Sequence, residues 1–389
     1  MVEPSRLHAT ECFLGRGIFN TDGVSWKKAH LASKSIFARA QISNLDILEE
    51  RLDVLLAMIP HDGTTVDLLP LLKRLFLDTS TQLIFGHSIN NLELGKGQFD
   101  IETFLAAFDT VLQGIGLRVA LGKFAFLQSL DRSWKKARDE SDRKGEEPFK
   151  SYQSPSPNRR LVLLDELLKT TQDRVSLPSQ LLNIFLPARD QTAIAAGNIF
   201  FNLARHPEVW NRLQNEVSNY DGPLTYESLK QMKYAKAIVN ESELNSQIIA
   251  SLMMVLTQYA KGLRILATSG RSIRSCGEDC ILPTGGGSDG KDPVLVVRGT
   301  DVNYIFRSMH LDKDVWGADA DEPRPERWEK LGTAQTRAYI PFSKEIEFVL
   351  HSKWCSMNGL ENRDPEERFV KQHRLQMESR NGVKVSFSL

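Results

Sequence analysis

Cysteine is scarce in this sequence, which has four thiols in 389 residues: Cys12, Cys276, Cys280 and Cys355. So few cysteines exclude a disulfide framework and fit a reducing compartment better. Cys276 and Cys280 have C-x3-C spacing, but a zinc site would need two more ligands at suitable spacing, and the nearby sequence offers none. We therefore expect this pair to be two small buried side chains.

Long apolar runs are missing too. The longest, residues 248–256, has nine residues, one of them a serine, whereas a membrane span needs about 20 apolar residues. The first residues, MVEPSRLHATE, are polar and lack the apolar centre of a signal peptide. The sequence therefore predicts no spanning helix and no secretory signal.

A net charge is also absent, because 49 Lys and Arg balance 49 Asp and Glu. Nucleic-acid binding needs a clustered basic surface, so this balance argues against nucleic acid as the main partner. The hydrophobic share of 41% and the charged share of 25% are those of an ordinary globular protein.

Helical periodicity dominates the first half. Apolar residues at helical spacing predict one helix over 42–59, before Pro60, and a second over 68–85, ended by Gly86 at the C′ position. A third is predicted over 101–112, behind a cap at Asp100. The charge-dense and then Ser- and Pro-rich stretch 131–158 predicts an exposed loop.

The longest predicted helix covers residues 180–204. Ser179 is its expected cap, and Pro187 is expected to kink it, because proline lacks a backbone donor and clashes with the preceding turn. Pro207 opens the next predicted helix.

Glycine and proline become frequent after about residue 270, where short strands are predicted over 293–297 and 302–306 with a turn between them. The last twelve residues, 378–389, predict a hairpin around Asn381 and Gly382. The fold class predicted is therefore mainly α with a small β part.

A glycine-rich run from Gly285 to Lys291 fits most of a phosphate-loop pattern. Asp292, however, takes the place of the hydroxyl that would bind magnesium, and a strand pattern follows instead of a helix. We expect a glycine turn here, which leaves a nucleotide-binding protein as a remote alternative.

Several segments in one order resemble the cytochrome P450 family: 15–30, 188–192, 203–210, 271–302, 309–328, 339–342 and 361–369. The segments LPTGGGSDG and LARHPEVW are similar to the fungal and yeast branch that hydroxylates n-alkanes and fatty acids. The resemblance implies an incomplete P450-like fold as a single domain over 1–389, without the anchor and first elements of that branch.

The same resemblance implies a haem b cofactor and a monooxygenase that places one atom of O2 into an apolar small molecule. The electrons would come from NADPH-cytochrome P450 reductase. The family's place is the endoplasmic reticulum membrane, and without an anchor this chain is expected to be cytoplasmic or peripheral.

Two residues match haem-propionate partners of the family. Trp26 can donate its indole N–H to a carboxylate, and His30 stands where the family has arginine, which exchanges a permanent bidentate donor for a titratable group. The alternative is that both simply lie on one face of an amphipathic helix.

Three residues match the oxygen side of the family's site. Asp190 matches the family's acid, a candidate proton relay. Gln191 stands where the family has a threonine hydroxyl, and Thr192 follows one position later. The alternative reading places Asp190 and its neighbour Arg189 on a solvated helix face.

Glu241 matches the glutamate of the family's Glu-x-x-Arg motif, but position 244 is leucine. Arg264 looks like the displaced second half, at a separation of 264 − 241 = 23 rather than 3. The resemblance pairs both with Arg327, the arginine of PERW, as the support of the haem loop. We therefore expect residues 242–262 to be an inserted segment, the alternative being a coincidental Glu and Arg.

The haem loop is the largest departure from the family. Its Phe-x-x-Gly-x-Arg-x-Cys-x-Gly pattern, begun at Phe342, places Val349 where the iron-binding cysteine is expected. Cys355 is the only later cysteine and is the candidate metal ligand, with His351 as a second possibility. The competing interpretation of the whole chain is a non-catalytic or misassembled P450 remnant without thiolate-bound haem.

Overall fold

A computed structural model describes residues 4–34, 45–60, 62, 64–93, 101–145, 163–170, 177–222, 225–241, 271–339 and 384–385. The α-helices in these ranges are α1 (Pro4–Leu14), α2 (Gly23–Lys34), α4 (Asp46–Met58), α5 (Leu68–Phe85), α6 (Ile101–Leu121), α7 (Arg132–Gly145), α9 (Leu163–Thr170), α10 (Leu177–Leu186), α11 (Thr192–Leu203), α12 (Pro207–Ser218), α13 (Tyr226–Gln231), α14 (Lys233–Glu241), α16 (Phe306–His310), α17 (Lys313–Trp316) and α18 (Thr333–Ala338). Two 3₁₀ segments, η1 (Gly122–Leu130) and η3 (Pro325–Lys330), and a π turn, η2 (Pro187–Gln191), accompany them. The strands are β1 (Val66–Asp67), β2 (Arg271–Ser275), β3 (Cys280–Gly286), β4 (Asp292–Val296), β5 (Asp301–Ile305) and β6 (Lys384–Val385).

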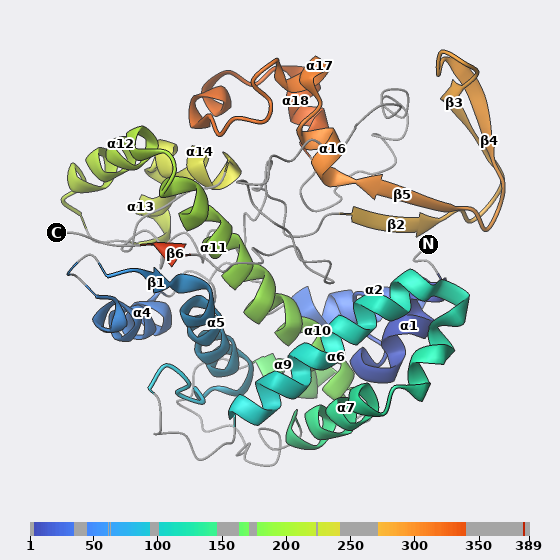
Figure 1. Cartoon of the computed structure of the whole chain (residues 1–389), viewed down its shortest axis with the longest axis horizontal. Helices are drawn as coiled ribbons and strands as arrows, with labels where there is room; N and C mark the ends of the chain where they lie inside the picture. Colours follow the sequence, from blue (N-terminus) through green and yellow to red (C-terminus); the bar gives the residue numbers. More distant parts are fainter. Residues whose placement is uncertain are drawn as a thin grey trace.

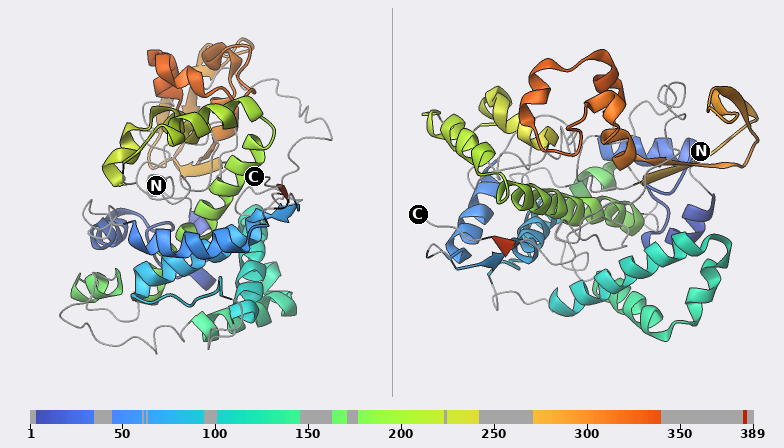
Figure 2. Two further views of the ribbon diagram at one scale, coloured as in Figure 1. Left: turned by 90° about the vertical axis from the view of Figure 1, so that its left-hand side faces the viewer. Right: turned by 45° about the horizontal axis from the view of Figure 1, so that its top comes forward.

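The fold is mainly α, as predicted. Figure 1 shows α10 and α11 in the middle of the helical body, with α4 and α5 on one side and α6 and α7 below. The π turn η2 joins α10 to α11. The strands β2 to β5 project from one end, beside α16 to α18, and the views in Figure 2 agree with this arrangement. The π turn η2 therefore lies between α4 and α5 on one side and α6 and α7 on the other.

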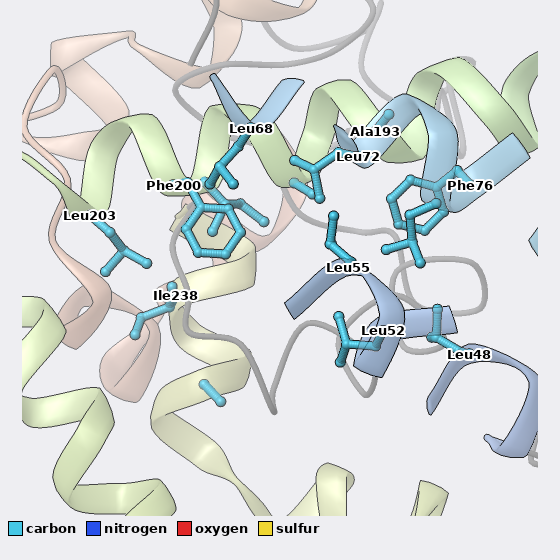
Figure 3. Close-up of a cluster of buried hydrophobic side chains, with 14 of the residues drawn as sticks. Leu48, Leu52, Leu55, Leu68, Leu72, Phe76, Ala193, Phe200, Leu203 and Ile238 are labelled. Carbon is cyan, nitrogen blue, oxygen red and sulfur yellow. The ribbon is translucent and has the colours of Figure 1, made fainter. Parts of the chain in front are cut away.

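One apolar core joins α4, α5, α11 and α14 (Figure 3). Leu55, Leu72 and Ile238 are almost fully buried there, and Phe200 of α11 is 4% exposed. Burial of each such side chain stabilises the fold by roughly 1.5–3 kcal/mol.

A second core joins α1, α5, α6 and α10 around Phe108. The Phe108 ring meets Phe13 edge-on at a centroid distance of 5.5 Å and Phe185 edge-on at 5.9 Å. Such edge-to-face pairs add to the stabilisation that burial alone gives. The second core therefore includes α10, and the first core includes α11, so each half of the central helix is packed into one of them.

Helix α5 forms over the predicted residues. The Asp67 carboxylate accepts a hydrogen bond from Leu69 N at 3.1 Å and caps the first turn. Gly86 ends the helix in the left-handed region at φ 77°, where a side chain would be strained. The predicted helix over 42–59 is confirmed as α4 for residues 46–58, and residues 42–44 lie outside the described residues. Helix α6 begins at the predicted residue but continues to Leu121, and its predicted cap Asp100 lies outside the described residues.

The predicted loop over 131–158 is wrong for residues 132–145, which form α7. The Asp131 carboxylate caps this helix through the N–H groups of Ser133 and Trp134. Trp134 is 3% exposed and donates its indole N–H to Val111 O at 3.2 Å. One anchored tryptophan thus holds a charged helix whose other side faces water.

The long central helix differs from its prediction in two respects. It begins at Leu177, so Ser179 lies inside it and does not cap it. The predicted kink at Pro187 is instead the π turn η2. A π turn skips the donor position that proline cannot fill, so the helix continues into α11. Pro207 opens α12 as predicted.

The described strands form three two-stranded antiparallel sheets. The predicted strands near 293–297 and 302–306 are confirmed as β4 and β5, but they pair with β3 and β2 rather than with each other. The glycine turn is confirmed, since Gly285 N donates to Gly290 O at 2.8 Å and β4 follows directly.

The far C-terminal strand β6 pairs with β1, with Val385 opposite Val66. The turn residues Asn381 and Gly382 of the predicted hairpin lie outside the described residues.

Among the described helices, none is both long and apolar enough to cross a membrane.

Candidate functional site

The π turn η2 places two charged residues in the middle of an apolar helix. Arg189 is 2% exposed and Asp190 is 3% exposed. Thr192, the first residue of α11, is also buried, whereas Gln191 is half-buried. The alternative of a solvated helix face is therefore wrong for Arg189 and Asp190. Wide helical turns of this kind are common at functional sites because they re-aim side chains.

Arg189 lies between two carboxylates and a ring. Its Nη1 donates to Asp109 Oδ1 of α6 at 3.2 Å, and its Nε lies 3.4 Å from Asp190 Oδ1, an ion-pair contact. The guanidinium carbon is 5.4 Å from the centroid of the Phe108 ring, a cation–π distance. The arrangement compensates charge where burial alone would be costly. Sequence reasoning missed Asp109, since no motif links it to Arg189.

The segment before α2 is fixed to α10 by Asn183, which is fully buried. Its amide nitrogen donates to Leu14 O at 2.9 Å, and its oxygen accepts from Phe19 N at 3.3 Å. A Cβ at Gly17 would overlap the Asn183 amide, so glycine permits this close approach. The only sequence signal was an isolated amide within the apolar run LLNIFL.

Trp26 and His30 lie on the exposed side of α2, one helical turn apart, with Ala29 as the buried residue between them. Their rings stack at a centroid distance of 4.9 Å and an interplanar angle of 14°. Trp26 is 41% exposed and His30 is also exposed, so neither ring belongs to the apolar core. Two ring N–H groups on an open helix face can meet the carboxylates of a ligand.

Arg327 of η3 is largely buried and holds the preceding segment. Its guanidinium donates to the carbonyl oxygens of Trp316, Asp319 and Glu322 at 3.0–3.2 Å. Arg324 and Arg327 hold the pKa of the Asp319 carboxyl below its usual value, mainly through the Arg324 hydrogen bond. Arg327 thus organises residues 316–322, the segment before the predicted haem loop.

A polar network joins η3 to α12 and α14. The Glu326 carboxylate accepts from Arg212 Nη1 at 2.6 Å and from the Tyr234 hydroxyl at 3.2 Å. The Glu216 carboxylate caps α14 by accepting from Tyr234 N at 2.9 Å and Ala235 N at 2.7 Å. The helix that ends at Glu241 is therefore fixed beside the PERW segment.

Other predicted site residues lie outside the described residues. These are Arg264, Val349, His351 and Cys355, together with the predicted insert 242–262. Glu241 ends α14, and the pairing predicted for its side chain remains a prediction.

The chemistry of three described residues is compatible with the haem that the resemblance implies. Asp190 is a buried acid at the helix break, and Trp26 and His30 carry ring N–H groups that would donate to the haem carboxylates. The position of the expected iron ligand does not fit by sequence, since Val349 has no atom that binds iron.

The comparisons with known proteins address the family directly. Residues 2–242 match the family model of cytochrome P450. The cytochrome P450 monooxygenase iccC of Talaromyces variabilis is 31% identical, over 99% of this chain and 77% of the relative. The monooxygenase fsdH of Fusarium heterosporum is 30% identical, over 96% and 67%.

Cytochrome P450 52A6 of Candida tropicalis is 33% identical, over 85% of this chain and 64% of the relative. The match to the family model ends one residue after Glu241, where the predicted insert begins. The resemblance found in the sequence is confirmed: this chain belongs to the cytochrome P450 family.

Proposed function

We propose that the fold serves to place one oxygen atom from O2 into a long apolar molecule, an alkane or a fatty acid. The observation that carries the proposal is the buried Arg189–Asp190 pair on the π turn of the central helix. A carboxylate held at a helix break, away from bulk water, can take up and release a proton next to a reacting group.

Proteins of this family bind haem b, which, with a thiolate on its iron, activates oxygen for insertion. The protein's own share is to bind the group, exclude water and move protons. Trp26 and His30 would hold the propionates, and Asp190 would exchange protons with the site. Arg189 would keep Asp190 oriented through their 3.4 Å contact.

The substrate class rests on resemblance. The segments LPTGGGSDG and LARHPEVW are similar to the alkane- and fatty-acid-hydroxylating branch. NADPH-cytochrome P450 reductase is the proposed electron donor, and the endoplasmic reticulum membrane is the proposed place of action.

A second function is favoured by one observation, Val349 at the ligand position. A chain without a thiolate there would be a non-catalytic member of the family. Cys355 and His351 are the substitutes that the sequence offers, and Cys355 is the one able to supply sulfur.

The test is the absorbance band that the reduced family members show with carbon monoxide. We expect no such band from the chain as written. We expect the band after repair of the loop by Glu345→Gly, Glu347→Arg, Val349→Cys and His351→Gly. A band from the unrepaired chain that Cys355→Ala abolishes would assign Cys355 as ligand. A repaired chain that folds but does not take up haem would support the non-catalytic function.

The same repaired chain tests the proton route. Gln191 is an amide, which does not shuttle protons easily, so we expect much of the reducing power to appear as hydrogen peroxide. Gln191→Thr should lower the ratio of peroxide to hydroxylated fatty acid. A low ratio with Gln191 in place, or a ratio unchanged by Gln191→Thr, would contradict this role.

A further inference from the structure

The sulfur atoms of Cys276 and Cys280 lie close together between the β2–β5 sheet and the β3–β4 sheet. Cys276 directly follows β2, and Cys280 begins β3. Their Sγ atoms lie 3.5 Å apart. A disulfide bond is about 2.05 Å long, so the sulfurs need to approach by only about 1.5 Å to form one. The sulfurs are in contact already, before any bond joins them.

The backbone on both sides of this contact is held. Cys276 N donates to Thr300 O at 2.9 Å, and Cys276 O accepts from Gly299 N at 2.9 Å. Cys280 pairs with Val296 in the β3–β4 ladder. Both cysteines are therefore fixed to the same neighbouring segment, and their contact is a property of the fold.

The intervening turn is held as well. The Asp279 carboxylate accepts a hydrogen bond from Arg298 N at 2.6 Å, and the Cys276 thiol lies 2.9 Å from Glu278 O. The five-residue loop from Cys276 to Cys280 thus has contacts that keep its two ends together.

The pair is accessible. Cys280 is exposed and Cys276 is half-buried, so the expectation of two small buried side chains is wrong. In the described part of the chain, no group of three or more His, Cys, Asp or Glu is placed to hold a metal ion. The contact suits a two-electron oxidation of both thiols to one disulfide by an external oxidant.

We propose that Cys276 and Cys280 are a modification site, at which hydrogen peroxide oxidises the two thiols to a reversible intrachain disulfide. One thiolate attacks a peroxide oxygen, so an S–O bond forms and the O–O bond breaks, which leaves a sulfenic acid and one water. The second thiol then attacks the sulfenic sulfur, the S–S bond forms, and the S–O bond breaks to release a second water. Two thiols are oxidised and one hydrogen peroxide is reduced. Thiol reductants reverse the bond by exchange.

The bond would link the β2–β5 sheet to the start of the β3–β4 hairpin. The experiment uses the full chain carrying Cys12→Ser and Cys355→Ser, so that Cys276 and Cys280 are its two remaining cysteines. The protein is treated with hydrogen peroxide, alkylated and digested with trypsin. Cleavage after Arg274 and Lys291 keeps both cysteines in one peptide, 275–291.

The expected product is this peptide without alkyl groups and lighter by two hydrogen atoms, restored to the dithiol form by reductant. The matched control, Cys280→Ser, leaves Cys276 alone, and peroxide should then add oxygen or join two chains. The proposal is overturned if the intact pair remains alkylated at peroxide levels that oxidise Cys276 in the control. It is also overturned if the intact pair only gains oxygen.

A rate comparison tests the contribution of the fold. Disulfide formation should be about tenfold faster in the folded chain than in the urea-unfolded chain at the same pH and peroxide concentration, because the fold holds the thiols in contact. Equal rates would overturn the claim that the contact is built for this reaction.

Discussion

Arg189 and Asp109 form an ion pair between the π turn and α6, with Nη1 and Oδ1 3.2 Å apart. The Arg189 side chain is 2% exposed and the Asp109 side chain is 36% exposed. A carboxylate near the surface thus compensates a cation in the interior, and that cation also faces Asp190. The acid proposed to move protons is therefore connected to α6 through one side chain.

Replacement of Arg189 should destabilise the fold strongly. Arg189→Met removes the cation that faces the buried Asp190, and loss of one partner of a buried pair costs about 3–5 kcal/mol. The free energy of unfolding in urea measures this. Arg143→Met, which removes an exposed pair with Glu140 on α7, should cost less than about 1 kcal/mol. Similar losses of unfolding free energy for both variants would contradict the conclusion that the buried Arg189 pair contributes more to stability than an exposed pair.

Asp78 should give the stability a characteristic pH dependence. Burial raises its pKa, although the N–H groups of Leu92 and Asn91 donate to the carboxylate and oppose the shift. A carboxyl whose pKa is raised in the folded state contributes stability below its unfolded pKa of about 3.9 and loses it as the pH rises through the folded pKa. Melting temperatures of the chain and of Asp78→Asn, compared from about pH 4 upward, should therefore diverge in favour of the variant.

Asp131 is the control with the opposite sign. Hydrogen bonds from Ser133 and from Trp134 N lower its pKa. Its contribution is present above the unfolded pKa and is lost as the pH falls through the folded pKa. Asp131→Asn should therefore lose its disadvantage on acidification, while Asp78→Asn loses its advantage. Parallel profiles for the two variants would contradict the assignment.

Removal of the Glu216 carboxylate should weaken α14. Glu216→Ala leaves Tyr234 N and Ala235 N without this acceptor at the helix start, and such a change costs about 1–2 kcal/mol. Gln214→Ala, an exposed change on α12, the helix that carries Glu216, should leave the melting temperature nearly unchanged. Hydrogen exchange over 233–241 should accelerate in Glu216→Ala alone.

Deletion of residues 243–262 should raise the yield of soluble protein and its melting temperature. The prediction rests on the sequence, where Glu241 and Arg264 are the separated halves of one motif. Rejoining the halves allows two charges to compensate each other. The gain should vanish when Arg264→Ala is added to the deletion. An unchanged or lower melting temperature in the deletion variant would argue against an inserted segment.

Local patterns in the sequence were sufficient for some elements. Helix α5 follows from apolar spacing and the glycine at 86, because both signals act within a few residues. Helix α7 was missed because its decisive contact is distant, from Trp134 to Val111 O across 23 positions. High charge density predicts a loop over these residues, whereas in the structure the charges lie on the outer side of an anchored helix.

The candidate site divides in the same way. Asp190 was found because it belongs to a motif, and Arg327 likewise. Asp109 and Asn183 were not, since their roles depend on helices that meet only in the folded chain. The partners of β4 and β5 were also missed, because two short strands with a turn between them fit a hairpin as well as two separate sheets.

During biosynthesis, β1 can pair with β6 only after nearly the whole chain has been translated. Val66 and Val385 are 385 − 66 = 319 positions apart. At about 5–20 residues per second, translation needs roughly 16–64 s between them. During that interval the side of β1 that β6 later covers has unpaired backbone groups, which are a template for other strands. We therefore expect residues 66–67 to stay without their partner strand until residues 384–385 have left the ribosome.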